Sequence, residues 1–257
     1  MHKRVAVKLS RAYTTINMDI TKLSTFKVFG QQLKLEASTG VFMPSANGLF
    51  YARSIRIDPG ERVIDIGTGS GVLAIAAAKC GARVSATDTD PRAVAAAERN
   101  AQINGVEIDV LSGELFSNYE GPFDVILANL PNEIVAPSYL CDLPTEDART
   151  FAGGNTGNEH LLELLKSASE FMSADARLYL GIHSLTDYHG TLKSAISNFS
   201  ARLLDLEELP AKSFVTDNLS FYQALNETGV INIFRNAEGQ WCTYGYVYEL
   251  SLLSTDA

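Results

Sequence analysis

The sequence predicts an α/β fold with a doubly wound, Rossmann-like and mostly parallel sheet. Three observations favour it. From about residue 60, apolar strand-like runs alternate with helical patterns of about 10–15 residues. A glycine-rich turn joins the first of these strands to its helix, and polar residues follow the ends of several strands. At 257 residues and 46% apolar content, the chain is long enough to bury one full core.

The alternating pattern continues to the end of the chain. The second helical pattern has Asp90 as its N-cap, Pro91 at its first position and Gly105 as its stop, and Gly81 ends the helix before it. We expect strands at 62–67, 82–88, 106–113, 123–130, 176–183, 201–209 and 243–253. We expect helices at 70–80, 90–105, 158–172 and 186–199.

Two parts of the chain lie outside this alternation. Residues 24–44 resemble two short strands around Gly30, which predicts a hairpin. The expected organisation is therefore an N-terminal arm and hairpin over 1–48, followed by a large domain over 49–257. An aromatic-rich, irregular segment at about 210–243 interrupts that domain, and it is either a lid over a substrate or a local core beneath a surface insertion.

The charge is unevenly distributed along the chain. The net charge is -9, which makes the protein a poor general binder of nucleic acid. Residues 1–34 nevertheless carry +6, which leaves -15 for the rest. The basic arm is either solvated or a contact for an acidic partner.

The sequence also favours a cytoplasmic protein. No apolar run approaches the roughly 20 residues that a membrane span needs, and the N-terminus lacks the apolar core of a signal peptide. Cys80, Cys141 and Cys242 are far apart with no CxxC pair, as is typical of reduced thiols. No His, Cys and Asp cluster predicts a metal site.

The turn after the first strand of the large domain carries the strongest signal. Gly67, Gly69 and Gly71 alternate between strand and helix, where they allow a sharp turn and a close approach of backbone to a ligand. The GxGxG spacing departs from the GxGxxG fingerprint of dinucleotide sites. Asp65 precedes the turn inside the strand, and Asp88 ends the next strand, where ribose hydroxyls are expected.

Together these features resemble the class I S-adenosylmethionine-dependent methyltransferases over roughly residues 40–250. The resemblance implies that S-adenosylmethionine is the cofactor. It implies that Asp65 lies near the cofactor's amino group, directly or through water, that Asp88 accepts from both ribose hydroxyls, and that Glu114 and Leu115 bind the adenine. The cofactor-binding set implied in this way is Asp65, Gly67, Thr68, Gly69, Gly71, Asp88, Thr89, Glu114, Leu115 and Asn129.

The stretch Asn-Leu-Pro-Asn at 129–132 ends the fourth strand of the large domain. In this fold class the ligand crevice lies at the carboxyl ends of the parallel strands. Methyl transfer mainly requires that an acceptor nitrogen or oxygen be positioned, and an amide such as that of Asn129 can accept its hydrogen bond. A plain turn at the end of a strand is the alternative, because Asn and Pro are common turn residues.

A narrower resemblance is to the HemK/PrmC family, which methylates the side-chain amide of glutamine in release factors. Its hairpin, its Asn-Pro-Pro-Tyr motif and its Gly-Gly-x-x-Gly stretch have counterparts at 24–44, 129–132 and 153–157. The resemblance implies substrate-binding roles for Asn129 and Pro131. Asn132 replaces the family's aromatic residue, so it supplies hydrogen bonds in place of a stacking surface.

From the acidic charge, from Asn132 and from the lack of room before the hairpin for the family's usual N-terminal helical domain, we expect a small polar metabolite as the acceptor, methylated on nitrogen or oxygen. The alternatives are protein-glutamine methylation, a cofactor-binding module without turnover, and other chemistry on the sulfonium. A protein acceptor is the second choice of partner, and a membrane partner is not expected. The expected catalytic set is Asn129, Pro131, Asn132 and His183. His183 ends the fifth strand of the domain, and is either a proton acceptor or a hydrogen-bonded histidine at a strand end.

Overall fold

The computed structural model describes residues 23–141 and 153–253. Its main sheet has the strand order β5-β4-β3-β6-β7-β10-β8, and β9 pairs with β10. The strands are β3 Arg62–Ile66, β4 Arg83–Asp88, β5 Asp109–Ser112, β6 Phe123–Ala128, β7 Met172–His183, β8 Phe199–Pro210, β9 Phe234–Arg235 and β10 Trp241–Leu252. The predicted α/β fold with a mostly parallel, doubly wound sheet is confirmed.

Strand direction decides which edge of the sheet carries the polar loops. β3, β4, β5, β6 and β7 pair in parallel, whereas β10 is antiparallel to both β7 and β8. β8 therefore runs in the same direction as the parallel strands. Its last residue, Pro210, lies at the edge where the other parallel strands also end.

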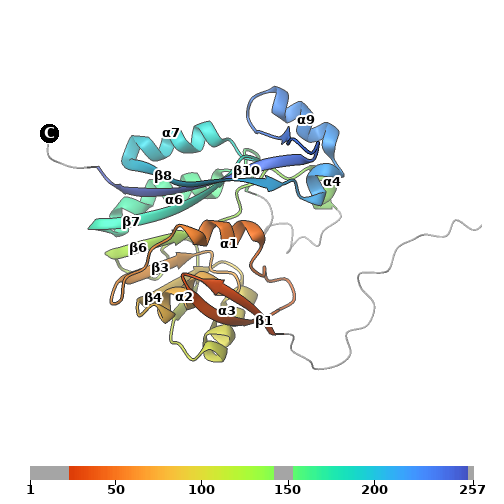
Figure 1. Cartoon of the computed structure of the whole chain (residues 1–257). Coiled ribbons are helices and arrows are strands. Elements are labelled where there is room, and N and C mark those ends of the chain that lie inside the picture. Colours follow the sequence, from red (N-terminus) through yellow and green to blue (C-terminus); the bar gives the residue numbers. More distant parts are fainter. Residues whose placement is uncertain (1–22, 142–152, 254–257) are drawn as a thin grey trace, which may run out of the picture.

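Helices cover both faces of the sheet (Figure 1). One core packs α1, α2, α3 and the hairpin against side chains such as Val63 and Leu127, and the opposite core packs α6 and α7 against side chains such as Ile64 and Ile126. Neighbouring residues of β3 and β6 thus point into different cores, as expected for strands buried on both faces. The helices are α1 Ala46–Arg53, α2 Val72–Lys79, α3 Pro91–Asn104, α4 Pro137–Cys141, α6 Glu159–Ser167, α7 Tyr188–Asn198, α8 Ser213–Thr216 and α9 Leu219–Glu227, with a 3₁₀ turn at Ala168–Phe171.

The predicted hairpin forms a separate two-stranded sheet. β1 Leu23–Val28 pairs with β2 Gln31–Glu36. Phe29 and Gly30 form the turn, and both have a positive φ, as the tight hairpin turn of type I′ requires. The basic arm before residue 23 lies outside the described residues.

The termini of α3 follow the sequence prediction. The Asp90 side chain caps the helix by accepting a hydrogen bond from the Arg92 N–H, and Gly105 ends it in the left-handed conformation. In contrast, α1 was not expected, because its sequence ANGLFYAR has little helical periodicity. Ser45 supplies the local start signal that was missed, since its hydroxyl accepts from the Gly48 N–H.

The 210–243 segment contains α8, α9 and β9. Together with the chain after β6, it builds a third apolar cluster around residues such as Ile134, Phe214 and Tyr222. The segment therefore has a core of its own, next to the edge where the parallel strands end. In the described part of the chain, no helix is long and apolar enough to cross a membrane.

Tyr51 of α1 joins the two central strands of the sheet. Its buried hydroxyl donates to the Tyr179 carbonyl at 2.7 Å and accepts from the Ala128 N–H at 2.9 Å. One side chain thus satisfies two backbone groups, on β6 and on β7. Burial raises the pKa of the hydroxyl well above its ordinary value, so it stays protonated.

We expect Tyr51→Phe to lower the free energy of unfolding by about 2 kcal/mol, because two buried backbone groups lose their partner. Chemical denaturation followed by circular dichroism measures this loss. Tyr188→Phe is the control, because its hydroxyl bonds to the Tyr248 hydroxyl and not to buried backbone. Equal losses in both variants would contradict the bridging role.

Candidate active site

Loops from six strand ends surround one cavity of about 1360 Å³. Its walls come from the loops after β3, β4, β5, β6 and β8, from the last residues of β7, from residues 40–48 before and within α1, and from residues of α6 and β10. Because the parallel strands all end at this edge, residues far apart in sequence meet there.

The glycine turn after β3 has the geometry that its sequence predicts. Gly67, Gly69 and Gly71 all have a positive φ, between 54° and 82°, which other residues rarely adopt. The N–H groups of Gly67 and Thr68 donate to the Thr87 carbonyl at 2.8 and 3.0 Å, and this ties the turn to the end of β4. Gly67, Thr68 and Gly69 line the cavity, while Gly71 starts α2 and packs against Ala97.

Asp65 lies beneath this turn and does not line the cavity. It is 1% exposed and accepts hydrogen bonds from the Thr68 hydroxyl at 2.7 Å and the Ala74 N–H at 3.2 Å. Burial raises its pKa to about 7, which the bonds from Thr68 and Ala74 oppose. A direct contact with the amino group of a cofactor is not part of this geometry, and Asp65 acts on the turn through Thr68.

Asp88 faces the cavity from the end of β4. One carboxylate oxygen accepts from the Gly69 N–H and the other from the Asp90 N–H, each at 2.9 Å. Burial raises its pKa, although both backbone bonds oppose the shift. The carboxylate is thus held in a fixed orientation beside the glycine turn, as a ligand for two adjacent hydroxyls must be. Thr89 follows it as an exposed residue of the cavity wall.

The loop after β5 adds Glu114 and Leu115 to the same wall. Leu115 has φ 48°, a strained value for a residue with a Cβ. The buried Thr87 hydroxyl donates to the Leu115 carbonyl at 2.7 Å and holds it there. With the glycine turn, an oriented carboxylate and this strained loop on one wall, the residues fit the sugar and base of S-adenosylmethionine.

Asn129 and Leu130 form the opposite corner, at the end of β6. Asn129 is exposed to the cavity, and a Cβ at Gly48 or Gly181 would lie 3.2 or 3.6 Å from its amide group. Leu130 is buried and closes against the glycine turn, where a Cβ at Gly67 would lie 2.6 Å from it. Asn129 and the half-buried Pro131 are thus available to a ligand, whereas Leu130 packs against the glycine turn.

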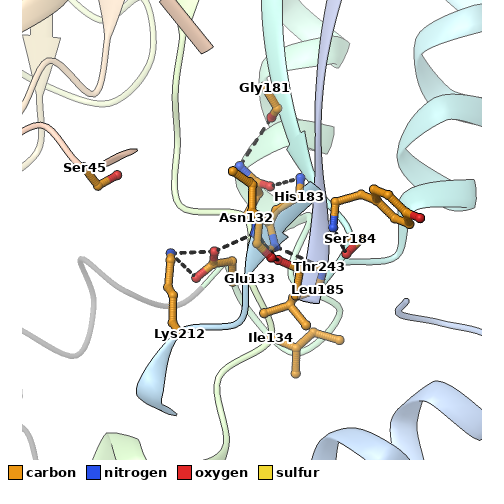
Figure 2. A network of polar contacts seen from close by, with 12 residues as sticks. Ser45, Asn132, Glu133, Ile134, Gly181, His183, Ser184, Leu185, Lys212 and Thr243 are labelled. Carbon is orange, nitrogen blue, oxygen red and sulfur yellow. Dashed lines mark hydrogen bonds and ion pairs between the residues drawn. The ribbon is translucent and has the colours of Figure 1, made fainter. Parts of the chain in front are cut away.

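Asn132 joins two strand ends and is 9% exposed (Figure 2). Its amide nitrogen donates to the Leu130 and Gly181 carbonyls at 2.7 and 3.3 Å, and its oxygen accepts from the His183 N–H at 2.7 Å. Both ends of the amide are therefore engaged within the protein. This removes the part of the argument for a small polar acceptor that rested on Asn132.

His183 is buried beside Asn132. Its Nδ1 accepts from the Leu185 N–H, and its Nε2 lies 3.3 Å from the Thr243 hydroxyl and 3.4 Å from a Glu133 oxygen (Figure 2). Burial lowers the pKa of the imidazole, while the Glu133 charge opposes this. The ring is therefore neutral near pH 7 with its proton on Nε2, and it orients Glu133. A role as proton acceptor stays a prediction.

Two site residues were missed from the sequence. Glu133 follows Asn132 directly, and both of its carboxylate oxygens accept from the Lys212 ammonium, at 2.6 and 2.8 Å. Two features of the sequence could have pointed to these residues. Glu133 follows the Asn-Leu-Pro-Asn stretch directly, and Lys212 comes just after the strand predicted at 201–209. Their pairing joins segments 79 positions apart, which no local pattern reveals.

The backbone of the Gly-Gly-x-x-Gly stretch at 153–157 supports the chain at Asn132 and Glu133. The Gly153 N–H donates to the Glu133 carbonyl, and a Cβ on Gly153 would come within 2.1 Å of the Gly157 carbonyl oxygen and 2.8 Å of the Asn132 Cα. Only glycine fits such a close approach. Within residues 23–141 and 153–253, no group of three His, Cys, Asp or Glu side chains could hold a metal ion.

Comparison with known proteins finds the strongest similarity in the part of the chain that carries the glycine turn and Asp88. The family model described as ribosomal protein L11 methyltransferase (PrmA) matches residues 49–140, which is less than half of the chain. The ribosomal protein L11 methyltransferase of Symbiobacterium thermophilum is 44% identical over 123 residues, or 48% of this chain and 39% of that protein. That of Caldicellulosiruptor bescii is 42% identical over 113 residues, or 43% of this chain and 37% of that protein. The match thus spans well under half the length of these relatives.

Solved structures agree on the fold. A Thermus thermophilus 16S rRNA N2 G1207 methyltransferase in complex with AdoMet and guanosine aligns with a TM-score of 0.58 and 14% identity, over 90% of this chain and 50% of that one. The predicted fold of the class I S-adenosylmethionine-dependent methyltransferases is confirmed, and the cofactor-binding part of the chain is similar to proteins named as methyltransferases.

Two sequence predictions need correction. A small polar metabolite as acceptor and most probable partner is wrong, because the relatives that share this part of the chain are named as methyltransferases of a ribosomal protein. The argument from Asn132 also fails, since its amide is engaged within the fold. The special similarity to the HemK/PrmC family is not shown by these matches, which carry another family's name.

The raised pKa of Asp65 makes stability depend on pH. The pKa of Asp65 is 3.8 in the unfolded state and about 7 in the folded state. Between these two pH values the folded protein holds a proton that the unfolded protein has released. The free energy of unfolding of the cofactor-free protein should therefore fall by up to roughly 4 kcal/mol from pH 4 to pH 7. Urea titrations across this range measure the fall, and Asp65→Asn should flatten it. Parallel curves for the two proteins would contradict the assignment.

Proposed function

We propose that the chain transfers a methyl group from S-adenosylmethionine to a nitrogen or oxygen of a protein. The domain over 49–257 holds the reaction, with 1–48 as an appended arm and hairpin. The exposed amide of Asn129 carries this proposal, because it borders the same cavity as the glycine turn and Asp88. A bound cofactor supplies an already activated methyl group on its sulfonium.

The site residues then have mainly positioning roles. Asp88 accepts from the ribose hydroxyls, the glycine turn borders the methionine part, and Glu114 and Leu115 border the adenine. Asn129 accepts a hydrogen bond from the incoming nucleophile and directs its lone pair toward the methyl carbon. Pro131 holds the chain at this corner.

A protein acceptor is supported by the names of the relatives and by the size of the cavity. The relatives of the cofactor-binding part are ribosomal protein L11 methyltransferases. A cavity of about 1360 Å³ exceeds the 300–1,000 Å³ typical of small-ligand pockets, which leaves room for an acceptor side chain beside the cofactor. A ribosomal-protein acceptor would place the reaction in the cytoplasm.

Transfer to a glutamine amide is a second candidate, and the Asn129-Leu130-Pro131 corner favours it. The buried Asn132 gives no stacking surface for a planar amide, which weakens this candidate relative to other protein groups.

The test follows methyl-labelled S-adenosylmethionine incubated with the protein, and either cell extract or purified ribosomal protein L11. We expect the label in a protein band. Asn129→Ala should reduce transfer at least about tenfold while cofactor affinity, measured by calorimetry, changes little, since it loses one positioning hydrogen bond. Asp88→Ala is the complementary variant and should lose cofactor affinity.

Other fates of the label contradict the proposal. Label only in small molecules would exclude a protein acceptor, and label in methylthioadenosine would mean attack at another carbon. A cofactor that binds without being consumed in any extract would indicate a binding module.

A further inference from the structure

The strand β8 lies at one end of the main sheet and is 12 residues long. Within the described residues, β10 is the only strand that pairs with it. The opposite edge of β8 therefore has backbone N–H and C=O groups that no described strand binds, and such an edge is a template for a further strand. Leu204 is skipped in the register with β10, so the longest regular run beside this open edge is 205–210.

The face of β8 that is turned toward α7 is apolar and partly uncovered. Cross-strand partners share a face of a sheet, and Leu203 and Leu206 lie opposite Tyr248 and Tyr246 of β10. Both tyrosines pack against α7 in one core. The two leucines, in contrast, are 47% and 49% exposed. The helix thus covers β10 but leaves an apolar strip beside the open edge.

The other face of β8 is acidic and is turned toward α1, since α7 and α1 lie on opposite sides of the sheet (Figure 1). Asp205 and Glu207 both contact the Arg53 guanidinium of α1, at 2.9 and 2.7 Å. One cation thus serves two carboxylates, and a negative charge remains in excess at this place. A strand that fits the open edge therefore carries apolar side chains toward α7 and basic ones toward α1.

The stretch RVAVKLSR, residues 4–11 of this chain, has that pattern. Its apolar side chains stand at every second position, and basic ones lie between them: the first set is Val5, Val7 and Leu9, and the second includes Arg4 and Lys8. Alternate side chains of a strand point to opposite faces, so the two sets would separate. These residues lie outside the part of the chain that the structure describes.

The position of β1 places the open edge within reach of this stretch. β1 begins at Leu23 and packs in one core with α1, and α1 contacts β8 through Arg53. The width of one helix, about 10 Å, and the length of β1, about 20 Å, thus separate Leu23 from β8. Residues 12–22 span up to about 36 Å when extended, which is enough.

We propose that residues 4–11 bind the open edge of β8 of the same chain as an added strand. Their apolar side chains lie beside Leu203 and Leu206, and their basic ones beside Asp205 and Glu207. The basic arm is then a contact for an acidic partner, and that partner is the chain's own sheet. The added strand also covers an edge at which copies of the chain could otherwise associate.

Hydrogen exchange at the open edge tests this contact. The Ala211 N–H donates to the Trp241 carbonyl, and backbone groups alternate along a strand, so the Leu206 and Glu208 N–H groups point away from β10. Because the Leu206 N–H already donates to the Asp205 carboxylate, Glu208 is the cleaner probe.

Measured by NMR in the full chain, the Glu208 amide should exchange at least about tenfold more slowly than in Val7→Asp. That variant places a carboxylate among the apolar side chains of residues 4–11 and should release the added strand. Lys8→Glu should accelerate exchange in the same way, because it brings a like charge to the acidic face of β8.

Two controls separate this contact from general effects. Thr15→Asp adds the same charge to the arm outside residues 4–11, and its Glu208 amide should exchange as in the wild type. The Val125 amide, in the buried strand β6, should exchange equally in all the variants, which shows that the sheet stays folded.

Equal exchange of the Glu208 amide in the wild type, Val7→Asp and Lys8→Glu would overturn the inference. So would a Thr15→Asp variant that exchanges as fast as Val7→Asp, because charge anywhere in the arm would then suffice. Slow exchange in the wild type should persist on dilution. If it were lost on dilution, a second copy would be covering the edge, and binding within one chain would be wrong.

Discussion

The parallel pairing of β3 through β7 is the constraint on which the site depends. Parallel strands need crossover connections, so each strand starts at one edge of the sheet and ends at the other. The glycine turn and Asn129 each follow a strand of this group, and Asp88 and His183 are each the last residue of one. The antiparallel β10 keeps β8 in the same direction, and this brings Lys212 to the same edge. Residues more than 140 positions apart therefore surround one cavity.

Bonds from side chains to backbone then hold these loops in place. Thr87 ties the loop after β5 to the end of β4, Asp88 ties the glycine turn to the start of α3, and Asn132 ties the end of β6 to the end of β7. Each bond satisfies backbone groups that a tight loop would otherwise leave unpaired. The loops thereby hold the Asp88 carboxylate in a fixed orientation and place Asn129 beside the cavity, so little backbone ordering is needed when a ligand binds.

The two walls of the cavity differ in charge and in rigidity. The cofactor side consists of the turn, Asp88 and the strained loop at Leu115, all close to the parallel core. The acceptor side joins a rigid carboxylate, Glu133, to a lysine carried by the inserted segment with its own apolar cluster. The family-model match covers residues 49–140, so it includes the first wall and Glu133, whereas Lys212 lies beyond the matched range.

The sequence by itself determined the fold class and the order of the main elements, and its resemblance to a known family implied the cofactor. These follow from local signals, because strand and helix periodicity, the caps of α3 and the glycine spacing before Asp88 all act over a few residues. It did not determine α1, whose pattern is weak, or the role of Asn132, whose residue type suits a ligand contact as well as a clamp. Only the tertiary structure decided that the Asn132 amide is engaged between strands, that Asp65 lies beneath the turn, and that Glu133 meets Lys212. These three outcomes depend on which chain segments the sheet order brings together, and such long-range pairing leaves no trace in local sequence.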